Sequence, residues 1–181
     1  EEHVLVAFAH VSNVLGSVLD AKRAAALAHK VDAKLLLDGC QALPRLPVNV
    51  ADLDCDFYAF SGHKMYAPMG IGALWGRHDL LKKMAPWQGG GDMIKSVSFE
   101  KTIFNDPPYV FEAGTPNVGG AVGLAAAIGY LSALGPANVR AHEADLLGYA
   151  TARLEAVEGL RIVGTAREKA AVVSFTLEGV H

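Results

Sequence analysis

Short, almost uninterrupted apolar runs recur in the N-terminal part of the chain, at residues 4–10, 34–37, 56–60 and 72–75. Apolar runs of this length are typical of strands that are covered on both faces of a sheet. Between the first two runs, residues 17–30 show helical spacing, and Ser17 and Asp20 are spaced as in a capping box that starts a helix. Strands that alternate with helices predict an α/β fold with a mostly parallel sheet.

The composition is that of a folded chain. Its 181 residues suffice for one sizeable core, and 51% of them are hydrophobic. The net charge of −3 and the lack of a basic stripe argue against nucleic acid as a partner. Two cysteines, Cys40 and Cys55, are too few for a disulfide framework, which favours a reducing compartment, and we expect a cytoplasmic location.

The middle of the chain changes in character. Residues 86–108 begin and end with clusters of Gly or Pro and predict a long excursion with little regular structure. Residues 118–139 carry no charge and are long enough to span a bilayer, but Gly135 and Pro136 interrupt them. We interpret residues 121–134 as a buried helix that is apolar on all sides, and we expect no membrane partner.

The last residues suggest a second unit. A more polar, amphipathic helix is predicted at residues 138–157, and a strand at residues 171–177. We therefore divide the chain into residues 1–137, part of a large domain, and residues 138–181, the start of a small α+β C-terminal domain. The chain opens directly before an apolar run, without a signal peptide or an initiator methionine, and we expect it to be a piece of a longer protein.

Lys64 directly follows one of the predicted strands. Residues 57–60 are mostly apolar, and Ser61, Gly62 and His63 lead from them to the lysine. A lysine placed by a rigid strand is how an enzyme presents an amine that attacks a carbonyl carbon. A hydroxyl and an imidazole beside exposed backbone N–H groups, as at Ser61 and His63, can bind phosphate. The aldehyde and the phosphate of pyridoxal phosphate (PLP) match these two features.

Asp38 closes the second apolar run, at the end of a strand where ligands of open α/β sheets bind. An aspartate at that place can hold a buried cation such as the protonated pyridine nitrogen of PLP. Gln41 follows three residues later and can form a hydrogen bond with the ring oxygen of that cofactor. His10 and Asn13 lie at the end of the first run, again at the carboxyl edge of the predicted sheet.

Each of these residues also has a purely structural interpretation. Asp38 followed by glycine is a common turn dipeptide, and Asp38 taken alone favours the turn. His63 alone is typical of a structural histidine, and Lys64 alone of a solvated surface lysine. Thr115 lies in the sequence F-E-A-G-T-P-N, which also fits the start of a helix. The set as a whole, rather than any single member, favours a cofactor site.

Other nucleotide-binding, hydrolase and metal motifs are absent from the sequence. The glycines of residues 70–76 lack the G-x-G-x-x-G spacing, and there is neither a P-loop nor a G-x-S-x-G motif. His142 and Glu143 lack the second histidine of a zinc protease, because position 146 is a leucine. No spacing of His and Cys fits zinc, and we expect no metal site.

Six segments, in this order along the chain, together resemble the class V aminotransferase-like PLP enzymes, and among these the cysteine desulfurases of the SufS type. The segments are H-V-S-N-x-x-G from His10, L-L-D-G-x-Q from Leu36, D-F-Y-A-F-S-G-H-K from Asp56, G-x-G-x-L-W-G from Gly70, G-G-G-D-M-I from Gly89 and F-E-A-G-T-P-N from Phe111. Each motif is weak alone, but the combination is specific and covers essentially the whole chain. The motif G-G-G-D-M-I favours the SufS-like group over the IscS-like and NifS-like group.

The resemblance implies a fold type I PLP-dependent transferase. Such a protein has a large domain with a mostly parallel sheet, a small C-terminal domain, and a homodimer whose active site lies at the interface. The resemblance further implies that Lys64 forms the Schiff base with PLP. It implies that Asp38 pairs with the pyridinium nitrogen and Gln41 with the phenolic oxygen.

The remaining site residues are also assigned by the resemblance. Ser61 and His63 would hold the phosphate of the cofactor. Thr115, with the amide near Gly114, would reach the phosphate of the cofactor bound by the other subunit. Asn13 would lie beside the cofactor ring oxygen and the substrate.

The implied reaction removes sulfur from L-cysteine and gives L-alanine and an enzyme persulfide, which supplies iron–sulfur cluster assembly through an acceptor protein. Lys64 would shuttle the proton at the substrate α-carbon, and a cysteine thiolate would attack the substrate sulfur. In the family, that cysteine and the arginine that binds the substrate carboxylate correspond to positions after residue 181. Neither Cys40 nor Cys55 matches the acceptor, so we expect this chain to be inactive alone.

Two other classes of function stay open from the sequence. Another class V PLP enzyme, such as a selenocysteine lyase, an epimerase or an aminotransferase, shares the residues near the cofactor. A non-catalytic scaffold that kept the fold is the other alternative, although it has no use for Lys64, Asp38 and Gln41 together. A cysteine at the acceptor position would favour the desulfurase, and loss of PLP binding would favour the scaffold.

Overall fold

The computed structural model describes residues 4–180. Its first part contains β1 (Leu5–Ala9), α1 (Ala21–Lys30), β2 (Lys34–Asp38), α2 (Val50–Leu53), β3 (Phe57–Ser61), the short helix η1 (Gly62–Lys64), β4 (Gly72–Gly76) and α3 (His78–Leu81). Its second part contains β5 (Ile94–Val97), β6 (Thr102–Phe104), the short helix η2 (Tyr109–Phe111), α4 (Val118–Leu134), α5 (Pro136–Glu155), β7 (Leu160–Val163) and β8 (Ser174–Leu177).

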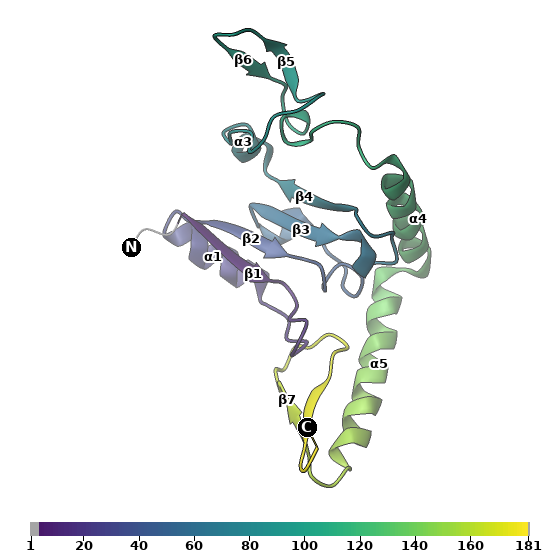
Figure 1. Ribbon diagram of the computed structural model, residues 1–181. Coiled ribbons are helices and arrows are strands. Elements are labelled where there is room, and N and C mark those ends of the chain that lie inside the picture. Colours follow the sequence, from purple (N-terminus) through teal and green to yellow (C-terminus); the bar gives the residue numbers. More distant parts are fainter. Residues whose placement is uncertain (1–3, 181) are drawn as a thin grey trace.

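The central sheet has the strand order β1-β2-β3-β4 (Figure 1). Strands β1, β2 and β3 are parallel, and β4 runs antiparallel to β3. Helix α1 covers one face of the sheet, where its Ala25 and Ala28 pack with Leu35, Leu37 and Tyr58 in the main core. The predicted α/β fold with a mostly parallel sheet is confirmed, whereas the division into two domains at residue 138 stays a prediction.

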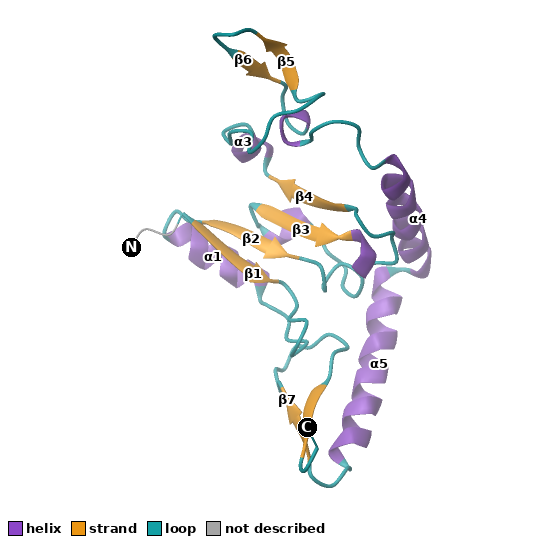
Figure 2. Ribbon diagram, in the orientation of Figure 1, coloured by secondary structure: helices purple, strands orange, loops and turns teal. Residues whose placement is uncertain are grey.

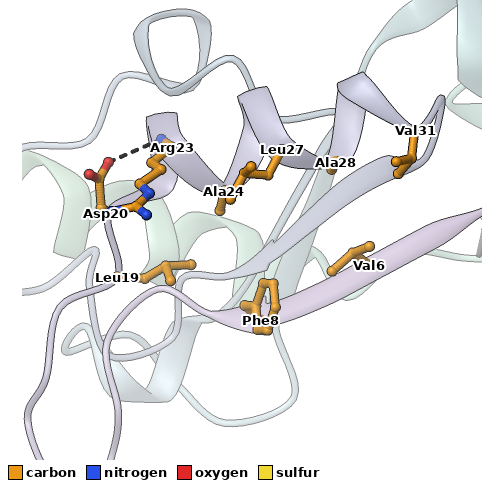
Figure 3. Close-up of a pocket in the computed structure, with 9 residues that line it drawn as sticks. All are labelled: Val6, Phe8, Leu19, Asp20, Arg23, Ala24, Leu27, Ala28 and Val31. Carbon is orange, nitrogen blue, oxygen red and sulfur yellow. Dashed lines mark hydrogen bonds between the residues drawn. The ribbon is translucent and has the colours of Figure 1, made fainter.

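The expectation that the strands are covered on both faces does not hold within residues 4–180. Strand β1 lies at an edge of the sheet, and its Leu5 and Phe8 are 49% and 47% exposed. Between β1 and α1 lies a hollow of about 430 Å³, lined mostly by apolar side chains, with Asp20 and Arg23 at one end (Figure 3). None of the predicted site residues lines this hollow, so it is separate from the candidate site.

Helix α1 begins later than the sequence predicts. Asp20 is its N-cap, and the carboxylate of Asp20 accepts a hydrogen bond from the backbone N–H of Arg23 at 3.0 Å. The helix start predicted at Ser17 is wrong, because Ser17 instead forms an isolated β-bridge with Lys169. A contact with a residue so distant along the chain leaves no trace in local spacing.

Buried Asp56 ties together the amino ends of β2 and β3. One carboxylate oxygen accepts hydrogen bonds from the backbone N–H of Leu35 at 2.8 Å and from Nε2 of His29 at 2.9 Å. The other oxygen lies 3.3 Å from Nε of Arg77. The Asp56 side chain is only 5% exposed, so these partners replace the water that the carboxylate loses on folding.

We expect Asp56→Asn to lower the free energy of unfolding by about 2 kcal/mol, because the new amide group must turn its NH2 end toward another donor, Arg77 or the Leu35 N–H. Asp54→Asn is the matched control, since Asp54 also pairs with Arg77 but its side chain is 61% exposed. Exposed pairs contribute about 0–1 kcal/mol. Urea denaturation of the whole protein, meaning the product of the complete gene, measures both variants. Equal losses would contradict the structural role of Asp56.

The region expected to have little regular structure, residues 86–108, contains one short β-hairpin. Strands β5 and β6 pair antiparallel and extend away from the central sheet (Figure 2). The prediction missed this hairpin, in which a register shift between Ile94 and Ser96 interrupts the side-chain alternation that marks a strand. Strand β7 was also missed, and it pairs antiparallel with β8, which is shorter than the strand predicted at residues 171–177.

Helix α4 begins after its N-cap Asn117, whose side-chain oxygen accepts a hydrogen bond from the backbone N–H of Gly120 at 2.9 Å. The prediction that this helix is buried on all sides is wrong, because Val122, Ile128 and Tyr130 are exposed. Among residues 4–180, no single helix has the length and apolar character needed to cross a membrane. Helices α4 and α5 meet that criterion only as a pair, and they are bent by 73° relative to each other.

Candidate functional site

The carboxyl ends of β1, β2 and β3 lie at the same end of the sheet, because these three strands are parallel (Figure 1). We call this end the carboxyl edge, or simply the edge; it is distinct from the side of the sheet that strand β1 forms. Ala9 of β1 is opposite Asp38 of β2, and Asp38 is opposite Ala59 of β3. This register places the residues at and just after the strand ends, His10, Asp38 and Ser61, along the same edge. The structure therefore brings together the predicted site residues that follow these three strands.

The turn after β2 fixes the direction of the Asp38 carboxylate. Its Oδ1 accepts a hydrogen bond from the backbone N–H of Cys40 at 2.9 Å. Gly39 is required in this turn, since a Cβ atom at that position would lie 2.0 Å from Cε1 of Tyr58. The turn interpretation and the site interpretation of Asp38 are thus compatible, because the turn leaves the Asp38 side chain exposed at the sheet edge.

Asp38 and Lys64 interact electrostatically. Partial burial by itself raises the pKa of the Asp38 carboxyl, but hydrogen bonding with Cys40 and the positive charge of Lys64 outweigh burial, and the pKa falls below its ordinary value of 3.8. Asp38 is therefore ionised at neutral pH. Both side chains are exposed, so both the carboxylate and the amine are available to a bound molecule.

A tight turn holds Lys64 at the end of β3. In helix η1, the backbone N–H of Met65 donates to the carbonyl oxygen of Gly62 at 2.9 Å. A Cβ atom at Gly62 would lie 2.8 Å from Cγ2 of Ile71, so the turn has little room for a larger residue. Met65 is buried and anchors the turn, whereas His63 and Lys64 are exposed beside it.

Asn13 and Gln41 lie in the segments that follow β1 and β2. Asn13 is exposed in a turn that Ser12 stabilises, since Oγ of Ser12 accepts a hydrogen bond from the backbone N–H of Leu15 at 3.0 Å. Gln41 is half-buried, and its Oε1 accepts a hydrogen bond from Nη1 of Arg45 at 2.9 Å. Arg45 was not identified from the sequence. The only signal there for its contact with Gln41 was the spacing of four residues between them.

Gly114 and Thr115 lie in a separate loop, between η2 and α4. The backbone N–H of Gly114 donates to the carbonyl oxygen of Gly91 at 2.9 Å, and Thr115 is exposed. Nδ2 of Asn117 donates to the carbonyl oxygen of Gly70 at 3.1 Å, which joins this loop to the segment after η1. The role assigned to Gly114 and Thr115, at the cofactor of a second subunit, stays a prediction.

A buried histidine–tyrosine pair lies next to the Asp38 turn. Nδ1 of His10 and the hydroxyl oxygen of Tyr58 are 3.0 Å apart, and the two rings meet edge to face. The backbone N–H of His10 also donates to the carbonyl oxygen of Asp38 at 2.9 Å. Burial lowers the pKa of His10 and raises the pKa of Tyr58, so both are neutral near pH 7. Tyr58 was missed because a tyrosine within an apolar run resembles any other core residue.

We expect the whole protein to lose stability as the pH falls below about 6.5, and the variant His10→Gln to lose less. The unfolded chain binds a proton at His10 near the ordinary pKa of 6.5, whereas the folded protein has a lower pKa there. Because the unfolded state then binds more protons, the free energy of unfolding rises with pH in this window and falls on acidification. Urea titrations between about pH 5 and 8 compare the two proteins, and parallel pH profiles would contradict the prediction.

The chemistry of the edge is that of a site for an anionic carbonyl compound. In the part of the chain that the structure describes, no group of three or more His, Cys, Asp or Glu side chains is arranged to hold a metal ion. The edge instead combines an ionised carboxylate, a primary amine, a hydroxyl and an imidazole. Ser61 and His63 can bind an anion, Asp38 can hold a cation, and Lys64 can attack a carbonyl carbon.

The chain is similar to curated cysteine desulfurases. It is 50% identical over 175 residues to a protein of Mycobacterium leprae named probable cysteine desulfurase 1. The matched residues make up 97% of this chain and 29% of that protein. It is 48% identical over 182 residues to a cysteine desulfurase of Escherichia coli. This match covers 100% of this chain and 45% of that protein. The chain thus spans less than half the length of these two relatives.

Solved structures share the fold. The cysteine desulfurase CsdA of Escherichia coli has a TM-score of 0.92 and 38% identity, over 98% of this chain and 44% of that chain. The C–S lyase C-DES, in a complex with cysteine persulfide, has a TM-score of 0.85 and 26% identity, over 96% of this chain and 47% of that chain. The family described as aminotransferase class-V matches residues 1–181. These matches confirm the predicted family: the chain belongs to the class-V aminotransferases.

Proposed function

We propose that the whole protein is a PLP-dependent cysteine desulfurase, to which this chain supplies many of the residues that contact the cofactor. The observation that carries the proposal is the placement of Asp38 and Lys64 at one sheet edge, where the charge of Lys64 helps to lower the pKa of the Asp38 carboxyl. The identity of 50% with proteins named cysteine desulfurase or probable cysteine desulfurase, over 97% of this chain, supports the same function.

The residues at this edge fit PLP. Its aldehyde requires a primary amine and its pyridine nitrogen an ionised carboxylate, which Lys64 and Asp38 provide on exposed side chains. Its phosphate requires hydrogen-bond donors, which Ser61 and His63 provide on either side of Gly62. Its phenolic oxygen accepts hydrogen bonds, which the side-chain amide of Gln41 can donate.

The chain's own residues have distinct tasks in this proposal. When bound, PLP supplies a ring that withdraws electrons from the substrate α-carbon. Asp38 would hold a proton on the ring nitrogen, because its lowered pKa keeps the carboxylate ionised. Lys64 would bond to the cofactor and, once a substrate amine has displaced it, would move a proton at the substrate α-carbon. An exposed side chain on an anchored turn suits both tasks of Lys64.

The proposed reaction converts L-cysteine to L-alanine. The thiolate of an acceptor cysteine attacks the substrate sulfur, the carbon–sulfur bond breaks, and the substrate carbon takes up a proton, which leaves a persulfide on the acceptor. Cys55 does not fit this task, because it is fully buried and burial raises the pKa of its thiol. Cys40 is half-buried in the Asp38 turn, which fits its interpretation as a small structural residue. The acceptor cysteine would therefore belong to another part of the whole protein.

We also propose a homodimer. Helix α4 exposes Val122, Ile128 and Tyr130, and exposed apolar surface of this kind favours burial in an interface. Thr115, with the amide near Gly114, would then reach the phosphate of the partner's cofactor. A monomeric whole protein that is fully active would contradict this role.

The finer assignments belong to the same proposal. The SufS type rests on the motif G-G-G-D-M-I at residues 89–94. The resemblance to that type implies a protein that accepts the persulfide sulfur. The cytoplasmic location that we propose rests on the scarcity of cysteine. Comparing the rates with L-cysteine and L-selenocysteine separates a desulfurase from a selenocysteine lyase.

The experiment that tests the function begins with an absorbance spectrum of the purified whole protein with PLP. We expect a visible band, its loss on borohydride reduction, and a label that peptide mapping finds on Lys64. Incubation with L-cysteine should then release L-alanine. A folded protein without the band would refute the PLP proposal, and a label on a different lysine would refute the role of Lys64.

A C–S lyase acting on cystine is the second candidate, because C-DES shares the fold at 26% identity. The products distinguish the two activities. L-alanine from L-cysteine supports the desulfurase, whereas cysteine persulfide from cystine, without L-alanine, supports the lyase.

A further inference from the structure

Arg45 contacts Gln41, a predicted cofactor residue, directly. Its Nη1 donates hydrogen bonds to Oε1 of Gln41 at 2.9 Å and to the carbonyl oxygen of Gln41 at 3.3 Å. The backbone N–H of Arg45 donates to the carbonyl oxygen of Ala42 at 2.9 Å, and Ala42 is fully buried. The contact between Arg45 and Gln41 is thus supported by a turn that is fixed in the core.

The chemistry of this pair determines which end of the Gln41 amide faces Arg45. A guanidinium group can only donate hydrogen bonds, so the Gln41 atom that faces Arg45 must be the amide oxygen. The two N–H bonds of the Gln41 amide then remain for another partner. An ionised phenolic oxygen only accepts hydrogen bonds, and it therefore needs the N–H end of the amide.

Arg45 also lies near a carboxylate of helix α5, without a hydrogen bond to it. Its Nε lies 3.6 Å from Oε2 of Glu143, and the two side chains are 24% and 27% exposed. Burial raises the pKa of Glu143, and the charges of Arg45 and His142 act in the opposite direction. Within residues 4–180, Nε of Arg45 is buried without a hydrogen-bond partner. The carboxylate of Glu143 therefore compensates the charge of the guanidinium group but accepts no hydrogen bond from Nε.

We propose that Arg45 is a positioning residue, which holds the oxygen of the Gln41 amide and thereby presents the amide N–H groups to the phenolic oxygen of PLP. The inference rests on the proposed binding of PLP at Asp38 and Lys64. Arg45 acts through Gln41 and not on the cofactor. None of the six motifs that carry the family resemblance includes Arg45.

The test uses four single variants of the whole protein. Arg45→Glu replaces a donor with an acceptor, which would draw the N–H end of the Gln41 amide away from the cofactor. Arg45→Met removes the donor without adding a charge, and Arg45→Lys keeps a donor. Glu143→Gln is the matched control, because it removes the ion pair with α5 and leaves the hydrogen bond between Arg45 and Gln41.

The readouts are the dissociation constant for PLP and the pH midpoint of the visible absorbance of the bound cofactor. We expect Arg45→Glu to weaken PLP binding about tenfold and to move the midpoint to higher pH, because an oxygen without its hydrogen-bond donor holds a proton more tightly. Arg45→Met should show a smaller change in the same direction. Arg45→Lys and Glu143→Gln should resemble the unmodified protein.

Two results would overturn the inference. One is an unchanged dissociation constant and midpoint in both Arg45→Glu and Arg45→Met. The other is an equal effect of Arg45→Glu in the background of Gln41→Leu, since a residue that acts through Gln41 has no effect once the amide is gone. Failure of the proposed function is distinguishable, because the unmodified whole protein would then not bind PLP at all.

Discussion

Lys64→Ala should abolish the covalent attachment of PLP and lower the rate of L-alanine formation by at least about 10³-fold. The variant loses both the amine that bonds to the cofactor and the group that moves the substrate proton, and proton transfer alone contributes about 10²–10⁴-fold. Asp38, Ser61 and His63 remain in Lys64→Ala, so PLP should still bind, but without a bond that borohydride can reduce. Peptide mapping after reduction and a rate assay of the whole protein measure the two effects.

The fold should survive this substitution. Lys64 is exposed at the end of η1, and the turn is held by the buried Met65 and by the backbone of Gly62. Surface substitutions of this kind change stability by about 0.5 kcal/mol or less. Lys83→Ala, at an exposed lysine after α3, is the control and should keep both the label and the rate. A rate in Lys64→Ala close to that of the control would remove Lys64 from the mechanism.

The central sheet could be predicted because its signals are local. Each of β1 to β4 coincides within one or two residues with an apolar run, and such a run can be recognised without knowing which distant strand it pairs with. The edge that carries Asp38 and Lys64 then follows from parallel pairing alone. Any residue at the carboxyl end of β1, β2 or β3 must lie on that edge, so the order of motifs along the sequence already places the two together.

Features that depend on distant partners could not be predicted. Helix α1 starts at Ala21 because Ser17 pairs with Lys169, and no local pattern records that bridge. The apolar composition of α4 shows that it must be covered, but not by what, and this chain leaves Ile128 and Tyr130 exposed. Periodicity reports how much apolar surface an element carries, whereas the covering surface is set by tertiary or quaternary contacts.

The residues of the candidate site also differ in how far the sequence could predict them. The placement of Asp38 and Lys64 was predictable because each follows an apolar run that forms a strand of the sheet, whereas their roles stay predictions. The supporting residues were not, since Arg45 matters only through the direction of its hydrogen bond to Gln41. Tyr58 likewise supports the turn through its contact with Gly39 and its hydrogen bond to His10, which a linear sequence does not show.

Asp38→Asn should lower the rate of L-alanine formation by about 10²–10³-fold while the fold and most of the PLP affinity persist. An asparagine keeps Oδ1, so the hydrogen bond from the backbone N–H of Cys40 that fixes the turn remains possible. The negative charge is lost, however, and a neutral amide cannot keep a proton on the pyridine nitrogen. Loss of one preorganised electrostatic group that acts on the reacting centre costs about 10²–10³-fold in rate.

The control for Asp38→Asn is Asp20→Asn. Asp20 also uses its carboxylate to accept a hydrogen bond from a nearby backbone N–H, here that of Arg23 at the start of α1, and asparagine is an equally good N-cap. Both variants therefore make the same chemical change at a backbone-bonded aspartate, but only Asp38 lies at the edge with Lys64. If the rate falls in Asp38→Asn alone, at equal urea stability, the charge of Asp38 acts on the cofactor. If the two variants keep the same rate, Asp38 is only the turn residue that the dipeptide Asp-Gly suggests, and the pyridine nitrogen must be held by another group.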